Sequence, residues 1–163
     1  MVILGIDPGL SFTGYGLIKK SGSRYFHIEH GVIETKKNQE QGERLFTIYD
    51  ALYNLIKIHK PAFAGVESLY FAKNVSSGLL VSQALGVILL VLNQCGVEVC
   101  QLAPNTIKKS VTGVARADKN QVQQCVKIFL GLPEIPKPDH AADALAIAIT
   151  AGNTNNANLK MKM

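Results

Sequence analysis

Two short apolar segments of this chain each end in an acidic residue, and this pattern restricts the fold more than any other feature. Val2–Asp7 reads VILGID and Ala62–Glu67 reads AFAGVE. An apolar run of this length, bounded by turn residues, is typical of a strand that is buried on both faces. Burying a lone carboxylate at the end of such a strand is costly unless its charge is neutralised. The two segments therefore predict a central sheet with negative charge concentrated at one edge.

The other periodic segments predict an α/β fold with a mixed five-stranded sheet. The first three strands form an antiparallel meander, and the later strand–helix–strand units imply parallel strands with helices on both faces. We expect one domain over residues 1–152 and a flexible polar tail over residues 153–163. The expected strands are Val2–Asp7, Thr13–Lys19, Phe26–Thr35, Ala62–Glu67 and Val97–Leu102. The expected helices are Glu43–His59, Ser76–Gln94, Pro104–Val111, a helix capped by Asp118 that ends at Leu130, and Asp139–Ala151.

The composition narrows the class of protein. Lys and Arg number 17 against 12 Asp and Glu, and this net charge of +5 suits a polyanionic partner, most often nucleic acid. The 3 cysteines show no C-x-x-C spacing, which argues against a disulfide framework or a zinc site and fits a reducing compartment. No segment has the pattern of a signal peptide or a membrane span. We therefore expect a cytoplasmic protein that does not enter a membrane.

The acidic residues indicate a metal site. If the strands that end in Asp7 and Glu67 are neighbours, their carboxylates about 4 Å apart repel by roughly 4 kcal/mol, and a divalent cation would reverse that repulsion. His140 and Asp143 are spaced to share one face in the first turn of the last helix, whose apolar remainder must pack against the sheet. Carboxylates with one imidazole suit Mg²⁺ or Mn²⁺. Two such ions about 3.5–4 Å apart can promote hydrolysis of a phosphodiester.

Each of these residues also has an interpretation that involves no metal. Asp7 before Pro8-Gly9 is compatible with a tight turn, Glu67 with a solvated loop, and His140 with the surface of a helix start. Asp139 follows Pro138 and precedes the helix, and this position favours an N-cap over a ligand.

Two further groups of residues indicate contacts with nucleic acid. Aromatic, basic and amide side chains follow Glu67 directly, where they can stack on unpaired bases, and a second, basic group surrounds a glycine-containing loop that can follow a phosphate backbone. The first group is Tyr70, Phe71, Lys73 and Asn74, and the second is Lys108, Lys109, Arg116 and Lys119.

Four motifs in order resemble the RuvC family of bacterial Holliday junction resolvases, over about residues 2–150. The first two are Gly5-Ile6-Asp7-Pro8-Gly9 with Gly14-Tyr15-Gly16, and Val66-Glu67 with Phe71-Ala72-Lys73-Asn74. The third comprises Ala103-Pro104, Lys108, Thr112-Gly113, Ala117, Lys119 and Gln121-Val122, and the fourth Lys137-Pro138 with Ala141-Ala142-Asp143-Ala144-Leu145-Ala146.

The resemblance implies a ribonuclease-H-like fold and a homodimer that nicks two opposed strands of a four-way DNA junction. The family prefers short T-rich sequences, leaves 5′-phosphate and 3′-hydroxyl ends, and works with the RuvA–RuvB branch-migration motor. By position, Asp7, Glu67 and Asp143 are the acidic ligands, and we expect His140 rather than Asp139 to be the fourth. Tyr70 stands where the family usually has Phe.

Three other functions remain to be distinguished. A nuclease of the same fold that acts on structured RNA would use similar acids. A non-catalytic module that binds junctions would not need them. A sugar kinase or an actin-like ATPase also has a phosphate loop that begins with Asp-x-Gly, but such a protein needs two related domains, and 163 residues are too few for both.

Overall fold

The structure, a computed structural model, describes residues 1–69 and 75–161, with side chains described over 1–69 and 78–154. Tyr70, Phe71, Lys73 and Asn74, which were predicted to contact DNA, lie outside the described residues.

Five strands form one mixed sheet in the order β3-β2-β1-β4-β5. The first three strands pair antiparallel, while β4 joins β1 and β5 joins β4 in parallel, so the predicted sheet is confirmed. This order places β1 at the centre of the sheet and makes β3 and β5 its two edges. The strands are β1 (Val2–Asp7), β2 (Phe12–Ser21), β3 (Arg24–Glu34), β4 (Phe63–Glu67) and β5 (Glu98–Leu102).

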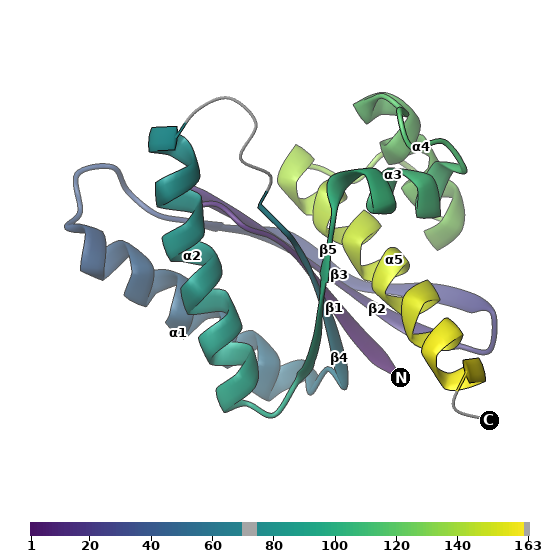
Figure 1. Cartoon of the computed structure of the whole chain (residues 1–163), viewed down its shortest axis with the longest axis horizontal. Coiled ribbons are helices and arrows are strands. Elements are labelled where there is room, and N and C mark those ends of the chain that lie inside the picture. The colour runs from purple at the N-terminus through teal and green to yellow at the C-terminus, as the bar shows by residue number, and fades with distance from the viewer. Residues whose placement is uncertain (70–74, 162–163) are drawn as a thin grey trace.

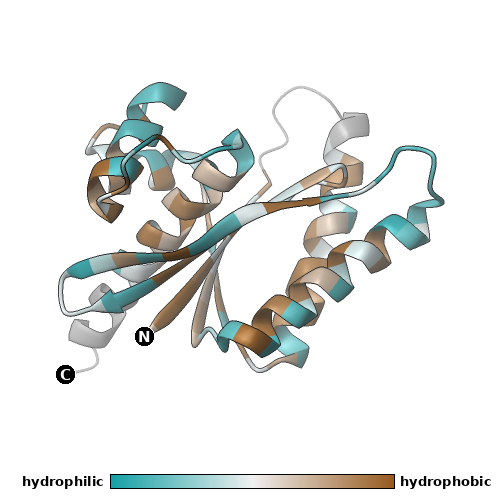
Figure 2. Cartoon of the chain, turned by 180° about the vertical axis from the view of Figure 1, so that it is seen from behind, coloured by the Kyte–Doolittle hydropathy of each residue, from teal (hydrophilic) through white to brown (hydrophobic). Residues whose placement is uncertain are grey.

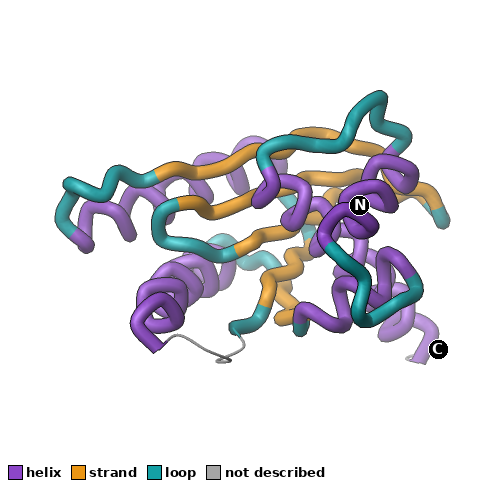
Figure 3. Tube along the Cα trace, turned by 90° about the horizontal axis from the view of Figure 1, so that it is seen from above, coloured by secondary structure: helices purple, strands orange, loops and turns teal. Residues whose placement is uncertain are grey.

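Helices cover both faces of the sheet, as Figure 1 shows and as the view from above in Figure 3 repeats. One layer contains α1 (Gln41–His59) and α2 (Val75–Gln94). The opposite layer contains α3 (Pro104–Thr112), α4 (Lys119–Leu130) and α5 (Asp139–Met161). The inner strands are mostly hydrophobic, whereas hydrophilic segments recur along the outer strands and along α1 (Figure 2). No helix in the described part of the chain combines the length and apolarity that a membrane span requires.

Each face of the sheet has its own hydrophobic core. Ile48, Leu52 and Ile88 fill the side of α1 and α2, and Leu145 and Ile149 of α5 fill the other side. The helix α5 approaches the strands closely because β1 and β2 present glycines to it. A Cβ at Gly5 would overlap the backbone of Ala144. This close contact fixes the position of the first turn of α5 relative to the end of β1.

The last helix is longer than predicted. It continues to Met161 instead of ending at Ala151, so the predicted end of this helix is wrong. Its continuation is held in part by β2 and β3: the buried Lys20 ammonium donates to the Gly152 carbonyl, and the Tyr25 hydroxyl donates to Asn153 Oδ1 at 2.5 Å. The polar composition of the segment concealed these tertiary contacts. The division into a domain over residues 1–152 and a flexible tail stays a prediction.

The two predicted helix caps have opposite outcomes. Asp118 caps α4, since its carboxylate accepts from the Gln121 backbone while the Gln121 side chain accepts from the Asp118 backbone. Asp139 does not cap α5, because it lies inside the first helical turn and the Pro138 carbonyl accepts the first helical hydrogen bonds. The carboxylate of Asp139 is therefore available for contacts with α4.

Candidate active site

Strand register brings two of the predicted acidic residues to the same edge of the sheet. Ile6 of β1 pairs in parallel with Val66 of β4, so Asp7 and Glu67 occupy equivalent positions at the carboxyl ends of neighbouring strands. The two carboxyl groups are close enough for the charge of Asp7 to raise the pKa of Glu67. The side chain of Asp7 is only 12% exposed, although it is acidic. The predicted pairing of these strands is confirmed, and the solvated-loop interpretation of Glu67 is excluded.

The first turn of α5 adds an imidazole and a third carboxylate. His140 Nδ1 donates to Asp7 Oδ2 over 2.7 Å. One potential ligand atom from each of Asp7, His140 and Asp143 lies within 4.8 Å of the other two. The approach depends on Gly14 of β2, where a Cβ would overlap the His140 carbonyl oxygen.

The local field disfavours negative charge on the acids of the strands. Burial raises the pKa of Asp7, and the charge of Asp143 raises it further, against the opposing hydrogen bond from His140. Burial, with the nearby charges of Asp7 and Asp143, raises the pKa of Glu67 to about 7. Carboxyl groups that converge and have raised pKa values are typical of a site for a divalent cation, because without the ion only nearby protein charges balance their negative charge.

Two lysines lie beside these acids in a pocket of about 230 Å³. Glu67, Asp143, Lys108 and Lys119 all line this pocket. The Lys119 ammonium lies 3.2 Å from Asp143 Oδ2. Burial would lower the pKa of Lys119, but the charge of Asp143 and the contacts with Asp139 outweigh it and raise that pKa. Lys119 therefore neutralises part of the acidic cluster.

Asp139 belongs to the edge of this site. Its Oδ2 lies 3.2 Å from the Lys119 ammonium, and its Oδ1 accepts from Gln123 Nε2 at 3.1 Å. These hydrogen bonds, from Gln123 and then Lys119, lower the pKa of Asp139. The three potential ligands that converge are Asp7, His140 and Asp143, without Asp139. The choice of His140 over Asp139 as the fourth ligand stays a prediction.

Two of the residues that were predicted to contact DNA, Lys109 and Arg116, do not line this pocket. Lys109 and Arg116 are exposed, and within the described residues neither has a carboxylate at ion-pair distance. Their positive charge is therefore available to a partner.

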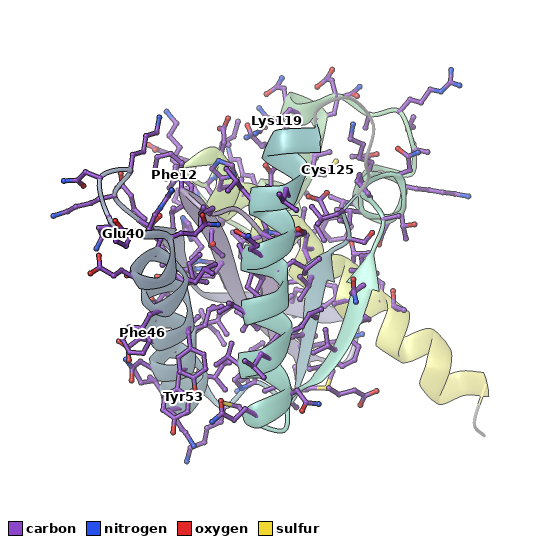
Figure 4. All side chains as sticks on the ribbon, turned by 60° about the vertical axis from the view of Figure 1, so that its left-hand side comes forward. Phe12, Glu40, Phe46, Tyr53, Lys119 and Cys125 are labelled. Carbon is purple, nitrogen blue, oxygen red and sulfur yellow. The ribbon has the colours of Figure 1, made fainter. Side chains whose placement is uncertain are left out.

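Sequence reasoning missed two residues that support the site. The Phe12 ring stacks on the His140 ring, with centroids 5.9 Å apart and planes 15° apart. Arg44 of α1 donates to the hydroxyls of Ser11 and Thr35, each at 2.9 Å, which holds the turn that presents Phe12. An aromatic residue at the exposed start of a strand, five positions after Asp7, was the only available signal for Phe12. Figure 4 shows Phe12 and Lys119 at the same end of the molecule.

Comparisons with known proteins agree with this geometry. Residues 3–151 match the family model described as crossover junction endodeoxyribonuclease RuvC. The crossover junction endodeoxyribonuclease RuvC of Treponema denticola is 57% identical over 93% of this chain and 85% of its own. That of Treponema pallidum is 52% identical over 91% of this chain and 76% of its own.

Solved structures agree as well. A structure described as T. thermophilus RuvC in complex with Holliday junction substrate superposes with a TM-score of 0.93 at 31% identity, and the match covers 97% of this chain and 96% of that one. The yeast mitochondrial resolvase Ydc2 has a TM-score of 0.63 at 14% identity, covers 98% of this chain and 85% of its own, and shares the fold. The ribonuclease-H-like fold that was expected from the motifs is confirmed, and the chain belongs to the RuvC family of crossover junction endodeoxyribonucleases.

Proposed function

We propose that this protein resolves four-way DNA junctions by metal-dependent hydrolysis of one phosphodiester in each of two opposed strands. The observation that carries the proposal is the convergence of Asp7, His140 and Asp143 ligand atoms within 4.8 Å, beside Glu67. The substrate is inferred from family membership and from the T. thermophilus relative, whose structure is described as containing Holliday junction substrate.

We propose Mg²⁺, with Mn²⁺ as a substitute, as the cation, and two ions in each site. The donor set supports this choice, since three carboxylates and one imidazole make a mainly hard-oxygen site. Asp7, Glu67, His140 and Asp143 would hold the ions. Divalent ions in such a site supply an activated water and stabilise the leaving oxygen of a phosphodiester.

Basic residues around the acids would bind the phosphates of the DNA substrate. The ammonium groups of Lys108 and Lys119 line the pocket beside the acids, where they can hold the scissile phosphate. The exposed Lys109 and Arg116 would contact the flanking DNA backbone. In the hydrolysis the oxygen of water bonds to phosphorus while the bond to the 3′ oxygen breaks and that oxygen gains a proton. The products are a 5′-phosphate and a 3′-hydroxyl.

Symmetric cutting requires two active sites, and we propose a homodimer that forms through α2. Leu79 and Leu90 of this helix are each 61% exposed, and Leu80 is 40% exposed. An exposed apolar surface of this kind marks an interface in many soluble proteins. On the adjacent α1, Phe46 and Tyr53 also point outward (Figure 4). Replacing Leu90 by Lys should yield a monomer in sedimentation analysis, and an unchanged sedimentation coefficient would contradict this interface.

We further propose that the protein acts in the cytoplasm and works with the RuvA–RuvB motor. Both statements rest on the resemblance to the family. Addition of RuvA and RuvB to a resolution assay on a mobile junction should change the position or rate of cutting.

The decisive experiment uses a synthetic four-way junction with mapped strand ends. Wild-type protein should nick opposed strands only with Mg²⁺ or Mn²⁺, and Asp7→Asn should retain junction affinity but lose cutting. Asp50→Asn is the matched control, because Asp50 is an exposed acid on α1. Cutting by Asp7→Asn at a near wild-type rate would refute the site.

Two further outcomes separate the alternatives. Preferential cutting of structured RNA would identify a ribonuclease. Tight junction binding without cutting in either metal would identify a non-catalytic binding module.

A further inference from the structure

A pair of histidines lies on edge strand β3, away from the acidic cluster. His27 Nε2 lies 2.7 Å from His30 Nδ1, and the ring centroids are 4.8 Å apart with planes at 64°. Both side chains are half-buried, so solvent reaches the pair. Nothing in the proposed hydrolysis uses these two residues.

An irregularity in the strand creates the pair. Residues three apart in a regular strand point to opposite faces of the sheet. Leu17 pairs with Glu29 and Ile18 with His27, so Ile28 is an extra residue without a partner in β2. This bulge returns His27 to the face that His30 occupies. Bulges at sheet edges commonly serve to redirect a side chain.

The chemistry of the pair suits a metal ion. Each neutral imidazole has one N–H and one lone pair, and the present contact uses one of each. If the donor ring moves its proton to its other nitrogen, two lone pairs face the same point with no net loss of a proton. We propose that His27 and His30 form a second cation site, one that takes a borderline divalent transition metal such as Zn²⁺, Ni²⁺ or Cu²⁺.

The surroundings leave room for such an ion. Tetrahedral Zn²⁺ with bonds of about 2.0–2.1 Å separates two nitrogens by about 3.3 Å, so the rings need to part by only about 0.6 Å. A pocket of about 270 Å³ adjoins His30 and is lined by the loop that contains Leu132 and Glu134. It offers space for waters that complete the coordination.

The composition of the site sets its selectivity. Glu29 does not join it, because its carboxylate accepts from Tyr15 and pairs with His59. Within the described residues, no third His, Cys, Asp or Glu converges on the pair closely enough to be a ligand. Two imidazoles without a carboxylate favour borderline metals over Mg²⁺. The acidic cluster and the histidine pair should therefore take different ions.

The test uses Zn²⁺ and the full chain with His140→Asn and Asp143→Asn, which removes competition from the acidic cluster. Long-range ¹H–¹⁵N spectra of the imidazole rings should show saturable shifts of His27 Nε2 and His30 Nδ1. Calorimetry should show about one Zn²⁺ per chain, with no displacement by millimolar-range Mg²⁺.

Variants of the remaining histidines complete the test. His30→Asn or His27→Asn should weaken Zn²⁺ binding about tenfold or more. His59→Asn is the matched control, because His59 pairs with Glu29 and should leave the affinity unchanged. Unshifted His27 and His30 resonances at saturating Zn²⁺, or equal affinity in His30→Asn, would overturn the proposal. The spectra of the parent protein decide the question even if a variant fails to fold. Neither result depends on whether the protein cuts junctions.

Discussion

The His140 imidazole and the Asp7 carboxylate are joined by a 2.7 Å hydrogen bond between residues that are 133 positions apart. Asp7 ends the central strand and His140 lies in the first turn of the last helix. The length of this bond therefore depends on the position of α5 relative to the sheet. Ligation of an ion by His140 through Nδ1 would require this bond to open, whereas ligation through Nε2 would leave it in place. The geometry of the site therefore depends on the close packing of α5 against the sheet.

Glu67 should make the metal-free protein less stable as the pH rises. Its pKa is raised to about 7 from 4.5, so the folded state favours the neutral acid. This contribution to stability is fully present below about pH 4.5 and is lost as the pH rises through about 7. Glu67→Gln should therefore raise the free energy of unfolding of the metal-free protein at pH 8 by on the order of 1–3 kcal/mol.

The measurement is urea unfolding in EDTA at pH 5 and at pH 8. Glu43→Gln is the matched control, since Glu43 is an exposed acid in α1. Mg²⁺ should restore wild-type stability at pH 8 and have less effect on Glu67→Gln. Equal responses of the two variants to pH would show that Glu67 is not the titrating group.

Lys119 should compete with the metal ion for Asp143. Its ammonium lies 3.2 Å from Asp143 Oδ2, so it occupies part of the charge balance that a cation would otherwise supply. Lys119→Gln should bind Mn²⁺ more tightly, by up to about fivefold, because an exposed pair of this kind contributes about 0–1 kcal/mol. The same variant should bind junction DNA more weakly.

Calorimetry of Mn²⁺ binding and a junction titration separate these two effects. Lys109→Gln is the control for Mn²⁺ binding, since this exposed residue lies next to Lys108 but has no ion pair among the described residues. Weaker Mn²⁺ binding in Lys119→Gln would mean that Lys119 supports the ion instead of competing with it.

Most of the fold could be predicted from the sequence because the local patterns of apolar and turn residues agree with the tertiary packing. The apolar runs of β1 and β4 are bounded by turn residues and end in acids, and the period of α1 places Ile48, Leu52 and Ile56 on one buried face. Neighbouring strands then bring Asp7 and Glu67 together without further information.

The missing parts depend on contacts between distant residues. The extension of α5 past Ala151 is supported by Lys20 and Tyr25, and no property of the polar segment itself encodes that. The carboxylate of Asp139 turns to Lys119 and Gln123, which a rule for helix starts does not consider. A local sequence pattern predicts local structure, whereas the conformation of these residues is determined by tertiary contacts.

Phe12 should act on cutting through His140. Its ring stacks on the imidazole at 5.9 Å and remains 43% exposed, so the contact restricts the His140 ring without forming part of the core. Phe12→Leu should lower kcat about tenfold, with little change in junction affinity, because supporting residues of metal ligands have effects of about 10–100-fold.

The Mn²⁺ affinity of Phe12→Leu should fall together with kcat, and this readout separates positioning of His140 from a role in binding DNA. Phe26→Leu is the matched control, because Phe26 is a comparably exposed aromatic residue on β3 at 49%. If Phe12→Leu lost junction affinity while its Mn²⁺ affinity stayed unchanged, the ring would be a DNA contact instead.

Gly14→Ala should damage both stability and cutting, because the glycine sets the distance between β2 and the first turn of α5. A Cβ there would overlap the His140 carbonyl oxygen and contact the His140 Cβ at 3.1 Å, and backbone cannot yield as a flexible side chain does. We expect a loss of about 1–3 kcal/mol in the free energy of unfolding, the usual range for overpacking a buried site. We also expect cutting to fall further than the loss of stability explains, since His140 would move away from Asp7.

Gly42→Ala is the control for this prediction. Nothing lies within 4 Å of a Cβ at Gly42, near the start of α1, and Ala there should be neutral or stabilising by up to about 1 kcal/mol. Thermal unfolding and junction cutting at a temperature where both variants are folded measure the two effects. Wild-type cutting by a destabilised Gly14→Ala would mean that the chemistry tolerates a displaced His140, and the ligand set would then be Asp7, Glu67 and Asp143 alone.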